Sequence, residues 1–485
     1  MRGLKSQFMA IVIGAAIGAT PQLARAQCED QLVLASDGSS GDFFGECVAI
    51  DGEWMVIGAT GDELPGEGIN TNRGAAYVFR KIDGKWFEHQ KLIPRITFDD
   101  QQFGDSVAIN GDSIAIGARS ATEFAYVFRL QGEAWIEEAR LEPIGGTLGG
   151  FGESVNISDD VLVVGAPLDS DIAFWSGAVH VFEFTNGVWE PRIKLLASDG
   201  HANARFGTSV DLNQETGQLF VGAPRQDVMP GSSGAVYVFQ RSLRDSAFKQ
   251  SAKVKPQDAP TITFGTSVAC DGHRLLVGAP DDDMFAPVNS NGAAFIFELK
   301  NDNWIQTRRL YPNDPGSNDE FGFSVAIDGE TIIVGAHQDG GIPDEPNEVE
   351  DHGSAYLFHL LDGEWTQATK LAGSTVFDIP FANFGRSVAI SGDDAIAGAY
   401  RGAVKGVTQP GRVFVYDARP PVAADLTADQ LVNGADLAQL LAQWGECTTP
   451  PSIPCNPNPC SADLNMDGVI NGLDLASLLS AWTGQ

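Results

Sequence analysis

Hydrophobic and polar positions alternate in short runs along most of this chain, and the runs recur in a fixed order. Near residue 321 the order is a Phe-Gly pair, an alternating run at 324–327, a tight Asp-Gly turn and a second apolar run at 331–336. A polar loop then leads to a third run at 355–358, and a fourth segment follows at 364–371. Alternation with a period of two, bounded by glycine turns, predicts short antiparallel strands. Each unit is therefore expected to contain four strands.

The same unit recurs along residues 31–417. Its Phe-Gly pairs begin at Phe44, Phe103, Phe151, Phe206, Phe264, Phe321 and Phe384. Tryptophans open five of the fourth strands, at Trp86, Trp135, Trp189, Trp304 and Trp365. Seven four-stranded repeats predict an all-β fold, a seven-bladed β-propeller over residues 27–417. Because these aromatic residues recur at equivalent positions, we expect them to pack between blades.

The ends of the repeat array predict how the ring closes. The seventh copy stops after its third strand at 413–416, while residues 31–38 parallel the end of a fourth strand at 194–200. We therefore expect residues 31–36 to complete the last blade, since an open ring would leave two unpaired edges. Cys28 and Cys47 flank this segment, and a disulfide between them is expected to hold it.

The repeat also has a family resemblance. Phe-Gly-x-Ser-Val followed by Val-Gly-Ala-Pro, seen at 151–167, 206–224 and 264–280, resembles the FG-GAP repeat of integrin α-subunit propellers. Calcium-binding repeats of that family carry an Asp-rich loop between their first two strands. This chain has two-residue turns there, for example Asp51-Gly52 and Asp271-Gly272, so the resemblance implies that those calcium sites are missing.

The loops between second and third strands differ in every copy and should emerge on one face of the ring. An unknown glycan or protein ligand is expected there. The candidate contacts are Phe174, Trp175, Asp281, Asp282 and Asp283. The aromatic pair suits stacking on a sugar or anchoring in a protein partner. The alternatives are that Trp175 folds back onto its own blade and that the acidic residues are simply solvated.

No catalytic motif is found, and no catalytic residue is assigned. The sequence therefore favours an exported adhesion or recognition protein. The alternative is a polysaccharide-degrading hydrolase or lyase, whose paired carboxylates cannot be recognised from sequence alone.

Charge and the N-terminal segment limit the partners and the location. The formal net charge is −33, which argues against nucleic acid because phosphate binding needs a basic face. Residues 1–26 have Arg2 and Lys5 before an apolar stretch and end in Ala24-Arg25-Ala26, as secretory signals do. We expect no membrane span, and a secreted or extracellular protein that could be attached to a cell surface.

After a linker at 418–424, the composition changes and a duplicated loop-helix unit begins. In the second copy, oxygen ligands fall at the positions of an EF-hand-type calcium loop: Asp463, Asn465, Asp467, Val469 (carbonyl), Asn471 and Asp474. In the first copy the equivalent residues are Asp425, Thr427, Asp429, Leu431 (carbonyl), Asn433 and Asp436. Apolar residues at helical spacing follow each loop. Two calcium ions are therefore the expected cofactors.

Two calcium loops that each have only an exiting helix resemble a dockerin type I domain, here residues 425–485. The resemblance implies a small α-helical domain that folds around calcium. It also implies that the domain docks onto a cohesin-like or other surface receptor. The whole chain would then be a recognition propeller carried on a calcium-dependent tether.

Overall fold

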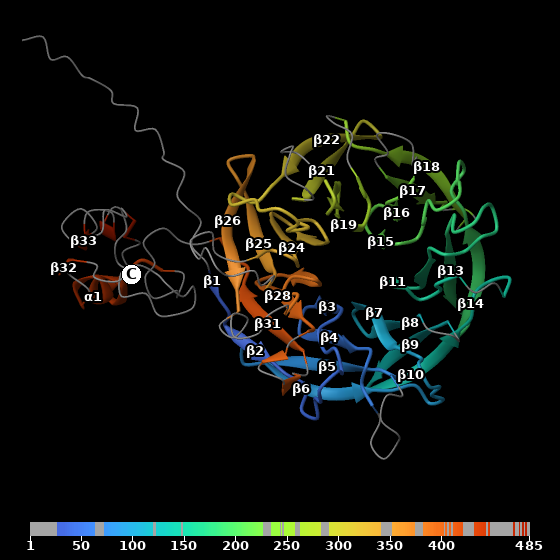
Figure 1. The fold of residues 1–485 in the computed structure, drawn as a ribbon, viewed down its shortest axis with the longest axis horizontal. Coiled ribbons are helices and arrows are strands. Elements are labelled where there is room, and N and C mark those ends of the chain that lie inside the picture. Colours follow the sequence, from blue (N-terminus) through green and yellow to red (C-terminus); the bar gives the residue numbers. More distant parts are fainter. Residues whose placement is uncertain are drawn as a thin grey trace, which may run out of the picture.

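The alternating runs form four-stranded antiparallel sheets, arranged as the blades of a ring around a central axis (Figure 1). The structure is a computed structural model. It describes residues 27–63, 72–119, 123–146, 149–226, 234–242, 244, 247–257, 262–282, 291–340, 352–373, 382–401, 403–404, 407–408, 411–420, 431–442, 445–446, 469–470, 475, 478, 479, 481 and 482. The predicted signal at 1–26 and most of the predicted C-terminal unit lie outside these residues. The prediction of an all-β, seven-bladed propeller is confirmed.

Strands at the same position in each blade are equivalent, and we number the blades 1–7 along the chain. The innermost strands are β3 (Val48–Asp51), β7 (Phe103–Asn110), β11 (Ser154–Ser158), β15 (Val210–Asn213), β19 (Ser267–Asp271), β23 (Ser324–Asp328) and β27 (Val388–Ser391). The second strands are β4 (Trp54–Ala59), β8 (Ser113–Ala118), β12 (Val161–Ala166), β16 (Gln218–Ala223), β20 (Arg274–Ala279), β24 (Thr331–Ala336) and β28 (Asp394–Ala399). The third strands are β5 (Ala75–Ile82), β9 (Phe124–Gln131), β13 (Ala178–Thr185), β17 (Ala235–Arg241), β21 (Ala293–Lys300), β25 (Ser354–Leu361) and β31 (Arg412–Asp417). The outer strands are β6 (Lys85–Leu92), β10 (Ala134–Leu141), β14 (Val188–Leu195), β18 (Phe248–Val254), β22 (Asn303–Leu310), β26 (Glu364–Ala372) and β2 (Gln31–Val33).

The N-terminal segment covers the edges of two blades. Strand β2 pairs antiparallel with β31, with Gln31 opposite Val415, and so supplies the outer strand of blade 7. Strand β1 (Gln27–Cys28) pairs parallel with β26 and adds a fifth strand to blade 6. The first and last parts of the propeller are therefore hydrogen-bonded to each other. A ring closed in this way does not present the open edges that invite pairing with another chain.

Short elements outside the blade frame complete the described secondary structure. Strands β29 (Ala403–Val404) and β30 (Val407–Thr408) form a small hairpin between the second and third strands of blade 7. After the propeller come α1 (Gly434–Ala442) and an antiparallel pair, β32 (Gly445–Glu446) with β33 (Val469–Ile470).

The core lies between neighbouring blades rather than in one central mass. The second strands are buried almost throughout, and one apolar cluster, for example, joins Ile57 and Tyr77 of blade 1 to Ile396 and Val413 of blade 7. The phenylalanines of all seven Phe-Gly pairs are fully buried, and the five tryptophans of the outer strands are buried as well. The predicted role of these aromatic residues in packing between blades is confirmed.

A ring of side-chain hydrogen bonds ties each innermost strand to the next blade. In every blade the residue two positions after the Phe-Gly glycine donates to the carbonyl of the next Phe-Gly glycine, over 2.8–3.0 Å. The donors are Cys47, Ser106, Ser154, Ser209, Ser267, Ser324 and Ser387. Ser387 donates to Gly45, so the last blade is joined to the first.

The glycine of each Gly-Ala pair is required by the same contact. A Cβ at Gly58, Gly117, Gly165, Gly222, Gly278, Gly335 or Gly398 would lie 1.9–2.1 Å from the carbonyl oxygen of the next blade's Phe-Gly glycine. No side chain fits at that distance, because real Cβ atoms essentially never approach within 3.0 Å of another heavy atom. The glycine of the Gly-Ala pair is therefore needed for the two backbones to meet.

The expected disulfide between Cys28 and Cys47 is wrong. Cys47 is a free thiol, and its Sγ donates to the Gly104 carbonyl at 2.9 Å. Cys47 occupies the position that serine fills in the other six blades. Its place in sequence next to the closing strand therefore did not indicate a disulfide.

Replacing Cys47→Ser tests this correction. Because Ser is native at the six equivalent positions, we expect the free energy of unfolding in urea to change by less than about 1 kcal/mol. A disulfide at Cys47 would instead make the substitution cost about 2–5 kcal/mol, an effect that reductant would reproduce in the wild type.

Replacing Gly278→Ala tests the backbone contact. The new Cβ would be 1.9 Å from the Gly322 carbonyl oxygen, so one backbone must move. We expect a loss of more than about 3 kcal/mol in urea unfolding, or failure to fold. Ser267→Ala at the same interface is the control and should cost only about 1 kcal/mol, the value of one hydrogen bond. Equal effects of the two substitutions would contradict this account.

Candidate functional site

One end of the ring is built from segments that enter the blades in an uncommon backbone conformation. The residue before each Phe-Gly pair has a positive φ: Phe43 (58°), Gln102 (54°), Gly150 (76°), Arg205 (55°), Thr263 (59°), Glu320 (55°) and Asn383 (53°). For a β-branched residue such as Thr263 this conformation is rare and costly. The blade frame imposes it, because the N–H groups of Gln102 and Phe103, for example, are bonded to carbonyls in the preceding blade's loop. The second-to-third-strand loops and these entry segments therefore lie at the same end.

Residues directly after the Phe-Gly pairs gather at this end, which we call the mouth. They are Glu46, Asp105, Glu153, Thr208, Thr266, Phe323 and Arg386. Arg119 lies 3.4 Å from Asp105 and 3.5 Å from Glu153, joining blades 2 and 3. Burial raises the pKa of Asp105 to about 7, and the charge of Arg386 in blade 7 opposes that shift, so charges on separate blades act on one another across the mouth.

The mouth has two chemically different sides. Blades 1–3 contribute the carboxylates of Glu46, Asp105 and Glu153. On the other side, the Arg386 guanidinium lies over the rings of Phe323 and Tyr400, at 4.8 and 5.2 Å from their centroids.

A buried histidine and a half-buried glutamate complete the basic and aromatic side. The ring centroid of His337 is 4.1 Å from that of Phe323. Burial lowers the pKa of His337 to about 3, aided by Arg386, so this ring is neutral at physiological pH. Burial also raises the pKa of Glu320 to about 7.

Phe174 and Trp175 form an exposed aromatic pair beside the mouth. Their rings stack with centroids 4.4 Å apart, and 59% of Phe174 and 36% of Trp175 remain exposed. The Arg205 guanidinium lies 5.8 Å from the Trp175 ring centroid. Phe174 and Trp175 are thus both on the surface. The alternative, in which Trp175 folds back onto its own blade, is not the arrangement in the structure.

The loop that carries this pair is held in place by hydrogen bonds. Ser170 Oγ accepts from the N–H of Trp175, whose backbone has a φ of 53°, and Lys194 Nζ donates to Asp169 and Asp171 at 2.6 Å. The carbonyls of Phe174 and Trp175 accept from N–H groups of blade 4, at residues 203 and 205. The aromatic pair is therefore presented by a braced loop.

The three predicted aspartates are not equivalent. Asp281 is half-buried and its N–H donates to Thr263 Oγ1, while Asp282 is buried and paired with Arg309. Asp283 lies outside the described residues. The structure therefore brings Phe174 and Trp175 together and separates Asp282 from the surface.

The opposite end of the ring uses its acidic turns for structure. The turn between the first two strands of each blade is hydrogen-bonded to the next, so that Asp51 accepts from the Gly111 N–H, Asp271 from Gly329 and Asp328 from Gly392. Ser391 accepts from Gly52 and closes this second ring. Among the described residues, no three His, Cys, Asp or Glu side chains are grouped as metal ligands would be.

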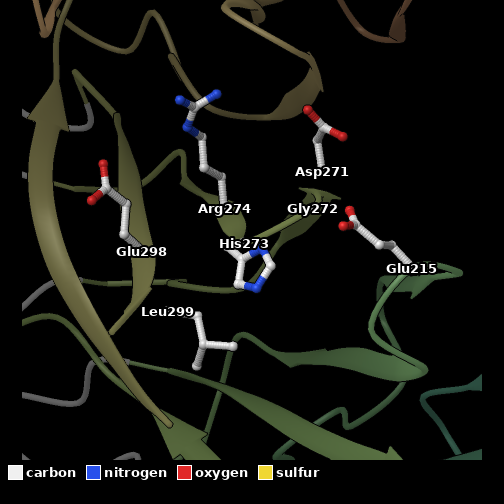
Figure 2. Close-up of a pocket in the computed structure, with 7 residues that line it drawn as sticks. All are labelled: Glu215, Asp271, Gly272, His273, Arg274, Glu298 and Leu299. Atoms are coloured by element: carbon white, nitrogen blue, oxygen red, sulfur yellow. The ribbon is translucent and has the colours of Figure 1, made fainter. Parts of the chain in front are cut away.

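A hollow lies at this opposite end between blades 4 and 5. It is lined by Glu215, Asp271, Gly272, His273, Arg274, Glu298 and Leu299. Figure 2 shows Glu298 and Glu215 on opposite sides of His273. Three of the polar residues already have structural roles: Asp271 accepts from the Gly329 N–H, Arg274 donates to the Gly329 carbonyl, and Glu298 is 2.7 Å from Lys300.

Part of the predicted calcium unit can be placed. Asn433 Oδ1 accepts from the Ala435 N–H, and Asp436 Oδ2 accepts from the Asn433 N–H, so these two residues cap the start of α1. Asp436 is fully buried, whereas Leu431 is exposed. For Val469 the structure gives its strand, β33. The predicted ligands Asp425, Thr427, Asp429, Asp463, Asn465, Asp467, Asn471 and Asp474 lie outside the described residues.

Sequence reasoning missed the charged residues of the mouth. Glu46, Asp105, Glu153 and Arg386 stand next to the most regular pair in the repeat, at a position that changes from copy to copy. That contrast is the signal that could have found them. Arg119 follows the second strand of blade 2 and could be linked to them only in three dimensions.

These features define a propeller whose repeated frame carries varied side chains at one end, and comparison with known proteins gives its family. The FG-GAP repeat model matches residues 29–79, 86–128, 135–182, 189–239, 248–297, 304–358 and 365–416, so the chain belongs to the FG-GAP repeat family. It is 36% identical over 119 residues to integrin alpha-11 of Homo sapiens, covering 23% of this chain and 10% of that protein. It is 32% identical over 163 residues to integrin alpha-2 of Bos taurus, covering 31% and 14%. The chain thus spans about a tenth of the length of the curated relatives it matches.

The described part of the chain contains no helix that is both long enough and apolar enough to cross a membrane.

Proposed function

We propose that this is an exported adhesion or recognition protein whose propeller binds a ligand at the mouth end. The observation that carries the proposal is the exposed Phe174–Trp175 stack. Large exposed aromatic residues are unfavourable in water, and here the loop that presents them is braced at both ends. Aromatic residues on a rigid support are the usual energetic centres of recognition surfaces.

The surroundings of the stack favour a protein ligand over a glycan. The mouth offers carboxylates on blades 1–3 and arginine with aromatic rings on blades 6 and 7, so a ligand with charged groups of both signs would be complementary to it. Similarity to integrin α subunits supports the same conclusion.

The enzyme alternative requires two carboxylates about 5–10 Å apart in a cleft. The hollow in Figure 2 is the place where such a pair would be sought, since Glu215, Asp271 and Glu298 line it. Two of these three are already engaged: Asp271 in a hydrogen bond to the next blade and Glu298 in an ion pair with Lys300. Binding at the mouth end is therefore the better-supported function.

Binding can be tested with the double variant Phe174→Ser/Trp175→Ser on a printed glycan array and a panel of immobilised extracellular proteins. We expect affinity for whichever probe the wild type binds to fall about 30-fold or more, as it does when about 2 kcal/mol of a central contact is lost. Phe87→Ser is the control, because Phe87 is similarly exposed (54%) but lies on the outer strand of blade 1. Equal losses in both variants would contradict the proposal, and consumption of a glycan probe with time would favour the enzyme.

We further propose that residues 425–485 form a dockerin-like, calcium-dependent tether to a cohesin-like or other surface receptor. Three observations support it. The capping of α1 by Asn433 and Asp436 is compatible with loop positions 9 and 12 of a calcium loop. Leu440 and Leu478, at equivalent positions of the two copies, are both fully buried. Their neighbours Leu441 and Leu479 are about half exposed in both copies and could contact the receptor.

Calcium binding can be measured by calorimetry on the full-length protein. We expect the wild type to bind two ions and Asp474→Ala to lose one, because position 12 supplies the carboxylate that completes the second loop. Asp281→Ala in the propeller is the control and should leave both ions bound. Retention of two ions by Asp474→Ala, or loss of one by Asp281→Ala, would place the calcium elsewhere.

A further inference from the structure

Blade 1 contains a buried cluster with more negative than positive charge. Asp42 and Asp62 are 4% and 2% exposed, and the residue before Asp62 donates its N–H to the Asp42 carbonyl at 3.1 Å, which sets the two segments side by side. Lys91 Nζ donates to Asp37 and Asp62, both at 2.8 Å. Lys91 thus bonds two of the three carboxylates, and its charge also acts on the third, Asp42. Buried charge without compensation is costly, so a further positive charge is needed.

The hydrogen bonds of Tyr77 point to a missing proton. Its hydroxyl oxygen lies 2.5 Å from Asp62 Oδ2 and 2.7 Å from Asp37 Oδ1. A hydroxyl has one proton and can donate it to one of these oxygens only. The other Asp62 oxygen, Oδ1, is buried with no hydrogen-bond partner. An ammonium group, Lys91, already bridges two of the carboxylates, so the remaining need is for a small cation such as a proton.

Blade 6 repeats the arrangement residue for residue. Asp319 and Asp339 are 3% and 4% exposed, and the residue before Asp339 donates its N–H to the Asp319 carbonyl at 3.4 Å. Lys370 Nζ donates to Asp314 and Asp339, both at 2.8 Å, and the Tyr356 hydroxyl lies 2.5 Å from Asp339 Oδ2. The set is again three carboxylates and one ammonium group.

Blade 4 shows the same site without the surplus charge. Asp199 accepts from Tyr237 and Lys253, each at 2.6 Å, as Asp37 does in blade 1. The other two positions are Ala204 and Gln226. In blades 3 and 5 the second aspartate is kept, as Asp169 and Asp282, and each is paired with one cation of the outer strand while the first position is Gly149 or Ile262. The surplus negative charge of blades 1 and 6 therefore comes from the first aspartate.

The structure assigns one buried proton-binding site to blade 1 and one to blade 6. In blade 1 the extra proton is shared by Asp42 and Asp62, and in blade 6 a second one is shared by Asp319 and Asp339. Blades 1 and 6 are the two neighbours of blade 7, where the ring closes (Figure 1). Asp62 and Asp339 begin loops of the mouth end, so release of the proton would loosen that end. This last effect on ligand binding rests on the proposed function, whereas the effect on stability does not.

The pKa shifts of Asp42 and Asp319 have the direction that a bound extra proton requires. Burial raises the pKa of Asp42 to about 6, with Asp62 and Asp37 adding to the shift and the Ser39 N–H and Lys91 opposing it. Burial raises the pKa of Asp319 to about 7, with Asp339 and Asp314 adding and the Gly316 N–H and Lys370 opposing. Both values exceed the ordinary 3.8, so the folded state binds these protons more tightly than the unfolded state does. The stability they contribute is present at low pH and is lost as pH rises through about 6 and 7.

The test is urea unfolding of the full-length protein from pH 5 to 8, for the wild type, Asp42→Asn and Asp319→Asn. Asparagine keeps an acceptor for the backbone N–H and can donate to the second aspartate without a shared proton. We expect the ratio of the wild-type unfolding constant to that of Asp319→Asn to rise by up to tenfold per pH unit from pH 5 to about pH 7 and to level off above it. The ratio for Asp42→Asn should rise from pH 5 and level off above about pH 6. Asp199→Asn in blade 4 is the matched control and should give a ratio that does not change with pH.

Two results would overturn the proposal. One is parallel pH curves for the wild type and both asparagine variants. The other is selective stabilisation of the wild type by millimolar calcium or magnesium above pH 7, which would make a metal the compensating ion. If a variant does not fold, infrared spectroscopy of the wild type decides: a protonated-carboxyl band must titrate between pH 5 and 8. None of these readouts depends on the ligand, so failure of the proposed recognition function would leave the result intact.

Discussion

The propeller depends on a close approach between two glycine backbones. In each blade the glycine of the Gly-Ala pair faces the carbonyl of the next blade's Phe-Gly glycine, at a separation that leaves no room for a Cβ. This contact lets a serine or cysteine bond the same carbonyl and lets the adjacent phenylalanine enter the core between blades. Because the contact occurs around the whole ring and Ser387 returns to Gly45, an error at one interface would strain the closure of all the others.

The repeated frame separates acidic residues that build the ring from those that could serve recognition. Aspartates in the turns at one end accept backbone N–H groups of the next blade, so their carboxylates hold blades together. At the mouth, the positions after the Phe-Gly pairs are free to vary, and they carry carboxylates on one side and arginine with aromatic rings on the other. The acidic residues behind the net charge of −33 therefore have different roles at the two ends of the ring.

A further set of acids lies inside the blades where the second strand ends. Each is matched with a cation, as Asp169 is with Lys194 and Asp282 with Arg309. An internal ammonium or guanidinium group on the outer strand thus neutralises a carboxylate that would be too costly to bury alone. Blades 1 and 6 depart from this balance, and that departure is what makes them candidates for proton binding.

The sequence alone determined the repeat, the number of blades and the residues that pack between them, because periodicity and glycine turns are local properties that every copy repeats. It also placed Phe174 and Trp175 in the loop between the second and third strands of a blade. It misjudged Cys47, and it grouped Asp282 with surface acids. Only the tertiary structure decided these points, as it decided the charged mouth and the paired aspartates. Partners such as Arg119 and Glu153, or Asp42 and Asp62, belong to different strands or blades. Whether a carboxylate is solvated, paired or left to share a proton is set by distances across the fold, which no local pattern records.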